Sequence, residues 1–498
     1  MIKRIAQAWG FAAIVLLPGY IDLTSSLGDE RMHVPWPLTR LVLGQLIDLA
    51  IVGFVFAGIL AILRRLKAWQ QIRWFVLALF PVYLLVCNLR IFPFRVSYSL
   101  VVMIAIVWFA VLAAVIFRAP LIAAKLYAFG SAVLSGAVVF AVVMTAQLVS
   151  VAFWHPGIQA FSGDIPSEPA NRPRLVWIIF DELAYMPVFE DRDATLDLPN
   201  FDRLRSQSTV YSDVTPIGYH TRLVVPSLLL GRVVIKSTIT AQNRFLVRTV
   251  DDPHWEPFDA SASVFGFARQ LGVTSTIVGW YLPYCSIFAG AATDCYWSND
   301  DTEDGAPPAV NANLGDDVWF PLRVAAEQLI APRAAVDDVA HWESLSHVAS
   351  VEDIGQHALN ALADNQADMI YLHLPTPHPP AFWNRRSHRF GVGGSYLDSL
   401  DYSDRLLGQI LDTLEAQPRW AHTTLVIQGD HSWRTGIWRT APGWSEEDER
   451  ISKGGQWDPR PLVLIHAAGQ TNAVTVASPT SLMYVHDFVV SQIQVLGR

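Results

Sequence analysis

The sequence predicts a bundle of membrane helices followed by an α/β domain with a mostly parallel central sheet. Five long apolar stretches lie within residues 1–153, and a membrane-spanning helix needs about 20 such residues. Beyond them, short apolar runs typical of buried strands alternate with helical patterns, as in α/β domains. The chain of 498 residues, 52% of them hydrophobic, therefore divides into a membrane domain (1–153), a linker (154–174) and a second domain (175–498).

The five apolar stretches are Ile5–Ile21, Leu41–Leu63, Trp74–Phe92, Tyr98–Phe117 and Leu126–Phe153. The first is short and follows Lys3-Arg4, so a cleaved signal peptide is an alternative to a retained helix. The loops expected on one side are basic, with Lys3, Arg4, Arg64, Arg65, Lys67, Arg73, Arg118 and Lys125. Because basic loops stay in the cytoplasm, we expect the second domain outside it.

Charge and cysteine content agree with an exported second domain. Residues 1–155 hold 12 Lys and Arg against 4 Asp and Glu, and the rest holds 24 against 41. An acidic domain argues against nucleic acid as a partner, so an anionic substrate needs a metal or local basic residues. Cys285 and Cys295 lie ten residues apart in this domain, whereas Cys87 lies in an expected span. We expect a disulfide between the pair, with two free thiols as the alternative.

The second domain follows a Pro-rich linker with Pro156, Pro166, Pro169 and Pro173. Its first strand is expected at Leu175–Phe180, where every residue is apolar. Three helix–strand pairs are expected after it: Ser263–Leu271 with Thr274–Gly279, Val351–Ala363 with Met369–Leu374, and Tyr396–Leu414 with Thr424–Gln428.

Acidic and imidazole side chains follow two of these strands. Asp181-Glu182 comes directly after the first strand, and Asp430-His431 follows the last of the three later strands. Either pair alone could merely cap the next helix. Together they predict a metal site, because functional groups gather at the carboxyl ends of parallel strands. Carboxylates with imidazole suit Zn²⁺ or Mn²⁺, which polarise phosphoryl or sulfuryl oxygens.

Thr221 is the candidate nucleophile, in the segment Gly218–Gly231 between the two acidic pairs. A lone threonine is usually structural. Beside a divalent ion, however, its hydroxyl could attack phosphorus and form a covalent intermediate that a second acceptor resolves.

Several segments resemble the alkaline phosphatase/sulfatase superfamily over nearly all of residues 175–498. The similar segments are LVWIIFDEL, LPNFDRLRSQSTVYSDV, YLDSLDYSDRLLGQILDTLE, TTLVIQGDHS and DPRPLVLIHAAGQ. In sulfatases the modified Cys or Ser stands two residues before a proline, and here that position is Val224. In phosphoethanolamine transferases the catalytic threonine stands five residues before the proline, as Thr221 stands before Pro226. Those transferases and the lipoteichoic-acid synthases also have five spans and an extracytoplasmic domain.

The resemblance implies roles for individual residues. Glu182, Thr221, Asp430 and His431 become metal ligands, Asp181 a ligand of a second site, and Thr221 also the nucleophile. His378, in LHLPTPHPP, matches a histidine beside the substrate phosphate, and the alternative is a histidine that caps a Pro-rich loop. Lys453, His220 and Arg222 are weaker candidates for contact with substrate, and His373 is expected to be a core histidine.

Two positions depart from the transferase pattern. Phe180-Asp181-Glu182 replaces a Gly-Glu-Thr, and Trp438-Arg439 stands where those enzymes have a further histidine. The resemblance still implies a multi-pass enzyme of a bacterial-type inner membrane. It would move phosphoglycerol or phosphoethanolamine from a phospholipid donor to an envelope glycan or lipid acceptor. A hydrolase (phosphodiesterase or sulfatase) and a catalytically inactive scaffold are the alternatives.

Overall fold

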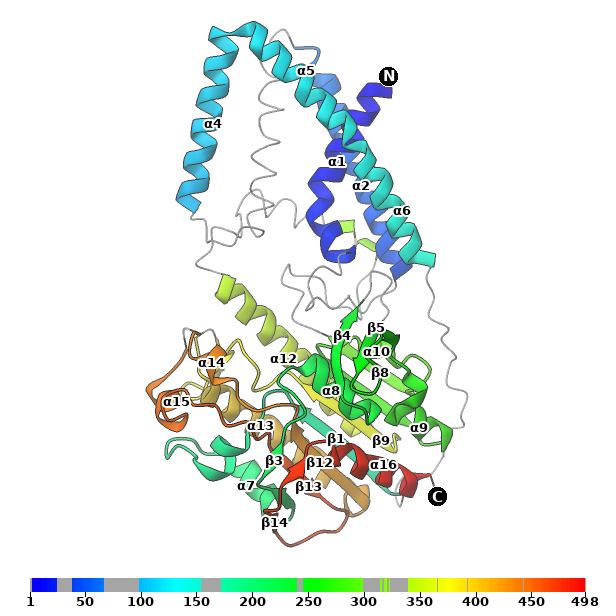
Figure 1. Ribbon diagram of the computed structural model, residues 1–498, viewed down its shortest axis with the longest axis vertical. Helices are drawn as coiled ribbons and strands as arrows, with labels where there is room; N and C mark the ends of the chain where they lie inside the picture. The colour runs from blue at the N-terminus through cyan, green and yellow to red at the C-terminus, as the bar shows by residue number, and fades with distance from the viewer. Residues whose placement is uncertain are drawn as a thin grey trace. The chain divides into compact units, whose positions relative to one another are not determined.

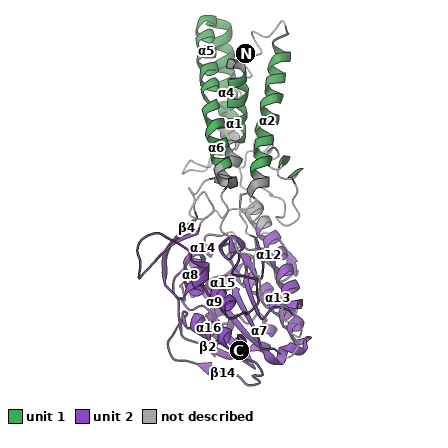
Figure 2. Ribbon diagram, turned by 90° about the vertical axis from the view of Figure 1, so that its right-hand side faces the viewer, with its two compact units in different colours: residues 1–155, 304–340 green, residues 156–303, 341–498 purple. Residues whose placement is uncertain are grey.

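A computed structural model describes most of the chain and divides it into two compact units (Figure 2). The described residues are 2–24, 38–66, 98–153, 172–239, 245–298, 314, 315, 318, 319, 322, 339–364, 366–391, 393–441 and 443–497. Unit 1 comprises residues 1–155 and 304–340, and unit 2 comprises residues 156–303 and 341–498. The expected span Trp74–Phe92 and most of the expected linker lie outside the described residues.

Unit 1 is helical. Its helices are α1 (Ile2–Thr24), α2 (Leu38–Leu63), α4 (Tyr98–Arg118), α5 (Pro120–Gly136) and α6 (Val138–Phe153). Within the described residues, two helical stretches are long and apolar enough to cross a membrane, Val42–Leu63 and Pro120–Gln147. The apolar parts of α1 and α4 are shorter. Two such helices are weak support for a membrane protein, and the expected bundle of five spans is not confirmed.

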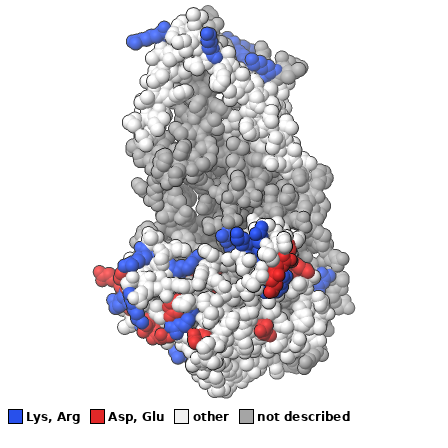
Figure 3. All heavy atoms as spheres, in the orientation of Figure 1, with Lys and Arg blue, Asp and Glu red and all other residues white. Residues whose placement is uncertain are grey.

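The first helix packs inside unit 1. Ala12, Ala13 and Leu16 of α1 are buried together with Val42 and Leu49 of α2 and with Ala141 and Met144 of α6. A Cβ atom on Gly10 would lie 2.1 Å from the carbonyl oxygen of Leu134, so only glycine permits this approach of α1 to α5. Residues of α1 thus form part of the core of unit 1. The basic side chains visible on unit 1 gather at one end of it (Figure 3).

Unit 2 is built on one eight-stranded sheet (Figure 1). The strands, in order across the sheet, are β14 (Val474–Val476), β2 (Thr209–Tyr211), β13 (Val463–His466), β12 (Thr423–Gly429), β1 (Arg174–Phe180), β9 (Met369–Leu374), β7 (Ser275–Trp280) and β8 (Asp294–Ser298). Only β13 runs against its neighbours, and all other pairings are parallel. The prediction of an α/β domain with a mostly parallel sheet is confirmed.

Helices cover the sheet, and short elements complete the unit. The α-helices are α7 (Pro199–Arg205), α8 (Thr221–Leu230), α9 (Val264–Gln270), α10 (Tyr284–Ile287), α12 (Val339–Ala363), α13 (Tyr396–Glu415), α14 (Thr435–Trp438), α15 (Glu446–Ile451) and α16 (Tyr484–Leu496). Other short helical turns are η2 (Met186–Glu190), η3 (Ala260–Ala262) and η5 (Pro418–His422). The remaining strands are β3 (Val214–Thr215), β4 (Val234–Ile239), β5 (Phe245–Thr249), β6 (Glu256–Pro257), β10 (Trp383–Asn384), β11 (Arg389–Phe390) and β15 (Thr480–Ser481).

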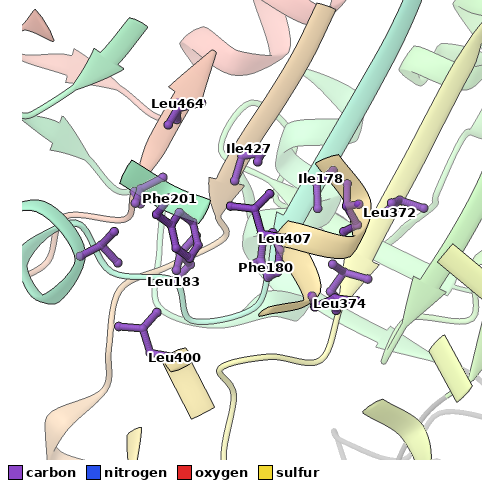
Figure 4. Packing of buried hydrophobic residues seen from close by; sticks show 14 of the residues in the cluster. Ile178, Phe180, Leu183, Phe201, Leu372, Leu374, Leu400, Leu407, Ile427 and Leu464 are labelled. Atoms are coloured by element: carbon purple, nitrogen blue, oxygen red, sulfur yellow. The ribbon is translucent and has the colours of Figure 1, made fainter. Parts of the chain in front are cut away.

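The main core lies between the sheet and helices α7, α12 and α13. Ile178 and Phe180 of β1 pack there with Ile427 of β12, Phe201 of α7 and Leu407 of α13 (Figure 4). Side chains alternate faces along a strand, so the intervening residues of β1 serve the opposite face. All seven residues of β1 are buried, as expected for a strand covered on both faces.

The expected helix–strand pairs are all present, with shifted ends. Helix α13 runs from Tyr396 to Glu415, one residue beyond the expected end, and α12 begins twelve residues before the expected Val351. Ser395 begins α13 with a capping box, in which its hydroxyl accepts from the Asp398 N–H and the Asp398 carboxylate accepts from the Ser395 N–H.

Candidate metal centre and nucleophile

Parallel pairing of β1 with β12 brings the two acidic motifs together. Phe180 is in register with Gly429, so Asp181 and Asp430, the next residues, leave the sheet side by side. A Cβ atom at Gly429 would lie 2.2 Å from the carbonyl oxygen of Leu183, so glycine is needed where the two loops meet. The two acidic motifs thus lie side by side because β1 and β12 are neighbours in the sheet.

Asp181, Asp430 and His431 form a buried cluster. Each offers one ligand atom, and these atoms lie within 4.8 Å of one another. Among the described residues, Asp181 Oδ1, Asp430 Oδ2 and His431 Nε2 find no hydrogen-bond partner, although all three atoms are buried. Such atoms are costly unless something compensates them. A divalent cation bound by two carboxylates and an imidazole fits this donor set.

The two carboxylates influence each other strongly. Burial, together with the negative charge of Asp430, raises the pKa of Asp181. Burial acts in the same direction on Asp430, but His431, His373 and the Glu182 backbone N–H lower its pKa overall. The pair therefore favours a state with less than its full negative charge, unless a cation lies between the carboxylates.

Thr221 is the first residue of α8, and its hydroxyl points into the cluster. Its Oγ1 donates a hydrogen bond to Asp181 Oδ2 at 3.0 Å, and the residue is buried. The N-terminus of a helix presents free N–H groups and a partial positive charge, which favour an anion beside the threonine. Val224, at the position of the sulfatase nucleophile, is fully buried within α8.

Glu182 was expected to be a metal ligand, but its carboxylate points away from the acidic cluster. Its backbone has a left-handed φ of 69°, and its N–H donates to Asp430 Oδ1 at 3.0 Å. The carboxylate is directed to other partners: Oε1 accepts from the backbone N–H and Nε of Arg434, and Oε2 accepts from Trp438 Nε1. In the described residues the acidic cluster that could hold an ion does not include Glu182.

His378 lies against the guanidinium of Arg434, with Arg434 Nη2 2.8 Å from His378 Nε2. Burial, with the nearby charge of Arg434, lowers the pKa of His378 well below its usual range. The imidazole is therefore neutral. Since arginine can only donate, Nε2 accepts and the ring hydrogen lies on Nδ1.

His373 is buried as expected of a core histidine, but it also contacts the site. Its Nε2 lies 3.3 Å from Asp181 Oδ2, and its Nδ1 is 2.8 Å from the hydroxyl of Tyr284, which also contacts Tyr371. In the sequence, the one sign of this contact is that His373 is a polar residue near the end of the otherwise apolar strand MIYLHL. Sequence patterns give no signal for Arg434 and Trp438. Both hydrogen-bond to the Glu182 carboxylate, and Arg434 also contacts His378.

The three weaker substrate candidates lie in different surroundings. Lys453 is exposed and pairs with Asp191, with Nζ 2.8 Å from Oδ2. His220 is the exposed residue before α8, and Arg222 is half-buried in its first turn. Both flank Thr221 directly in the chain.

The domain that carries the site matches a known protein family. The sulfatase family matches residues 173–471, more than half of the chain. The chain belongs to the sulfatase family. Sulfatase-like enzymes use a divalent metal, and in this chain Asp181, Asp430 and His431 are placed to hold one. A search of curated proteins found no match.

Several solved structures match part of this chain at low identity. Ps i-CgsB with k-i-k-neocarrahexaose is 13% identical with a TM-score of 0.43, covering 65% of this chain and 72% of that one. The phosphonate monoester hydrolase of Agrobacterium radiobacter is 13% identical, with a TM-score of 0.38 and coverage of 65% and 74%. The PsFucS1 sulfatase from Pseudoalteromonas sp. is 11% identical, with a TM-score of 0.42 and coverage of 65% and 68%.

Proposed function

We propose that this sulfatase-family protein is a membrane-bound, metal-dependent transferase that moves a phospholipid headgroup through a phosphothreonine at Thr221. The donor would carry phosphoglycerol or phosphoethanolamine, and the acceptor would be an envelope glycan or lipid. The contact between Thr221 Oγ1 and Asp181 Oδ2, at 3.0 Å beside the buried cluster, carries the proposal. The apolar helices of unit 1 support it, because the diacylglycerol product can then stay in the bilayer.

The cation would be zinc or manganese, held by Asp181, Asp430 and His431 with the Thr221 hydroxyl beside them. When bound, it supplies positive charge that stabilises the developing negative charge on the ester oxygens. The two oxygens of Asp181 serve different purposes: Oδ1 has no hydrogen-bond partner among the described residues, and Oδ2 accepts from Thr221. Asp181 can therefore contact a cation and receive the threonine proton at separate atoms.

In the first half-reaction Thr221 Oγ1 bonds to phosphorus and its proton passes to Asp181 Oδ2. The bond between phosphorus and the glycerol oxygen of diacylglycerol breaks, and that oxygen takes a proton from water. In the second half-reaction an acceptor hydroxyl bonds to phosphorus and its proton passes to the hydroxide left in the first step. The bond between phosphorus and Thr221 breaks, and the threonine oxygen recovers its proton from Asp181 Oδ2. A nucleophile at the usual sulfatase position is excluded here, because Val224 has no nucleophilic atom and is buried.

Mass spectrometry of the intact, purified chain with phosphatidylglycerol or phosphatidylethanolamine vesicles and Mn²⁺ or Zn²⁺ tests this proposal. We expect an adduct on Thr221 whose mass identifies the headgroup. Thr221→Ala should lose the adduct and at least about 10⁴-fold in turnover, whereas Thr221→Ser should keep part of both. Thr215→Ala, at an exposed threonine in β3, is the matched control and should behave as the parent.

The outcome also separates the alternatives. An adduct that persists until a glycan or lipid hydroxyl is added indicates a transferase, and an adduct lost to water alone indicates a hydrolase. If Thr221→Ala turns over lipid as fast as the parent, the phosphothreonine mechanism is wrong. No turnover by the parent with any donor would favour an inactive scaffold.

A further inference from the structure

Arg434, at the start of α14, is held by two hydrogen bonds to one carboxylate. It precedes α14 and follows His431 by three residues. Its backbone N–H and its Nε donate to the same Glu182 oxygen, at 2.6 and 3.0 Å. The Arg434 side chain is 18% exposed and that of Glu182 is fully buried. Both the backbone and the side chain of Arg434 are thus oriented by one carboxylate.

Glu182 is itself fixed by groups around it. Its carbonyl oxygen accepts from the Tyr396 hydroxyl at 2.9 Å, and its second carboxylate oxygen accepts from Trp438 Nε1 at 3.1 Å. Its N–H donates to Asp430, one of the candidate metal ligands. Glu182 therefore connects the geometry of the acidic cluster to the position of the Arg434 guanidinium, without contributing its carboxylate to that cluster.

The rest of the guanidinium faces the site. Nη2 contacts His378, and within the described part of the chain the hydrogen bonds of the Arg434 side chain use Nε and Nη2, not Nη1. The positive charge interacts with Asp181 and Asp430 as well as with Glu182, and these carboxylates raise the pKa of Arg434 although burial alone would lower it. A permanent cation with unused donors beside a candidate metal site and a candidate nucleophile is suited to a tetrahedral oxyanion.

We propose that Arg434 binds the non-bridging oxygens of the anionic ester, and that Glu182 is the residue that positions it. This inference rests on the proposed function only in that the substrate is a tetrahedral anionic ester. A phosphodiester and a sulfate ester share that chemistry. His378, whose ring hydrogen lies on Nδ1, completes the arrangement as a neutral partner that leaves the positive charge on Arg434.

Binding of inorganic phosphate to the full chain in detergent, measured by calorimetry with Mn²⁺ present, tests the inference. We expect Arg434→Gln to weaken phosphate binding by about tenfold to a hundredfold, the usual range for loss of charge-assisted hydrogen bonds. Arg434→Lys should recover part of the affinity, since it keeps the charge and loses the planar fork. Arg439→Gln is the matched control, because Arg439 is half exposed and pairs with Glu449 on the same segment.

Glu182→Gln separates positioning from metal binding. We expect it to weaken phosphate binding while the bound metal, measured by elemental analysis, stays at the parent's level. It should raise KM for the lipid more than it lowers kcat. Loss of metal from Glu182→Gln would overturn the positioning role, as would phosphate affinity equal to the parent's.

Phosphate binding tests the role of Arg434, and adduct formation on Thr221 tests the proposed function, so the two can fail separately. Phosphate binding that depends on Arg434, in a chain that forms no adduct on Thr221, would support this inference and contradict the transferase. An adduct on Thr221 with unchanged phosphate affinity in both Arg434→Gln and Arg434→Lys would overturn this inference alone. Absence of any phosphate binding by the parent would also overturn it.

Discussion

The two oxygens of the Asp430 carboxylate have different surroundings. Oδ1 accepts from the Glu182 N–H, and Oδ2 has no hydrogen-bond partner within the described residues although it is buried. An oxygen in this position is costly in the folded chain unless a cation or a proton compensates it. Asp430 is therefore the residue at which metal binding can be tested most directly.

We expect Asp430→Asn to lose bound metal, because an amide oxygen carries no formal charge for the cation. Mutation of a residue that hydrogen-bonds to a metal ligand lowers metal affinity by about 10–100-fold. Loss of a ligand itself should lower it at least as much. Elemental analysis of dialysed protein measures the effect. Asp448→Asn is the control: Asp448 is equally buried but caps α15, so this variant should lose stability and keep its metal. Parent-level metal in Asp430→Asn would contradict the assignment.

At the scale of elements, the disulfide links α10 to the edge strand β8. Cys285 and Cys295 are bonded, which confirms the sequence prediction. Tyr284, next to Cys285, reaches the site through its hydroxyl contact with His373. A Cβ atom on Gly279 of β7 would lie 2.2 Å from the Tyr284 ring, so glycine makes room for that ring. The disulfide thus supports an element that contacts His373, which lies beside Asp181.

Replacement of both cysteines by serine should lower the free energy of unfolding by about 2–3 kcal/mol, since closure of a short loop restricts the unfolded chain. Urea unfolding of the full chain in detergent measures this change. Cys87→Ser is the control, because it leaves the pair intact. In that background both remaining thiols should resist alkylation until reductant is added, and ready alkylation without reductant would refute the bond.

At the scale of the whole molecule, the sequence combines an apolar, basic N-terminal part with an acidic α/β domain. The surface helices of unit 1 carry many exposed apolar side chains, among them Phe54, Phe117 and Leu121. Such exposure is unfavourable in water and ordinary in lipid. It supports the proposed location in the membrane.

Single cysteines in a Cys87→Ser background test the proposed topology. We expect Ala473→Cys, exposed in unit 2, to react with a membrane-impermeant maleimide on intact spheroplasts. Ala124→Cys, exposed beside Lys125 in α5, should react only after the membrane is opened. The reverse pattern would place the sulfatase domain in the cytoplasm, and release of the chain from membranes by salt would argue against any span.

The sequence by itself determined the elements whose signals are local. The apolar run before Asp181, the helix expected at Tyr396–Leu414 and the pair Cys285 and Cys295 each depend on a short segment. All three are present in the structure, the helix with one further residue. The shared position of Asp181 and Asp430 was also predictable, because parallel strands carry their functional groups at one end.

Only the tertiary structure decided which of these side chains meet. Glu182 follows Asp181 directly, yet its left-handed backbone turns the carboxylate to Arg434, a residue 252 positions away. His373 is an ordinary buried strand residue in sequence, and its contact with Asp181 follows from the pairing of β1 with β9. Local patterns reflect the preferences of nearby residues, whereas the partner of a buried polar group depends on which distant segments pack against it.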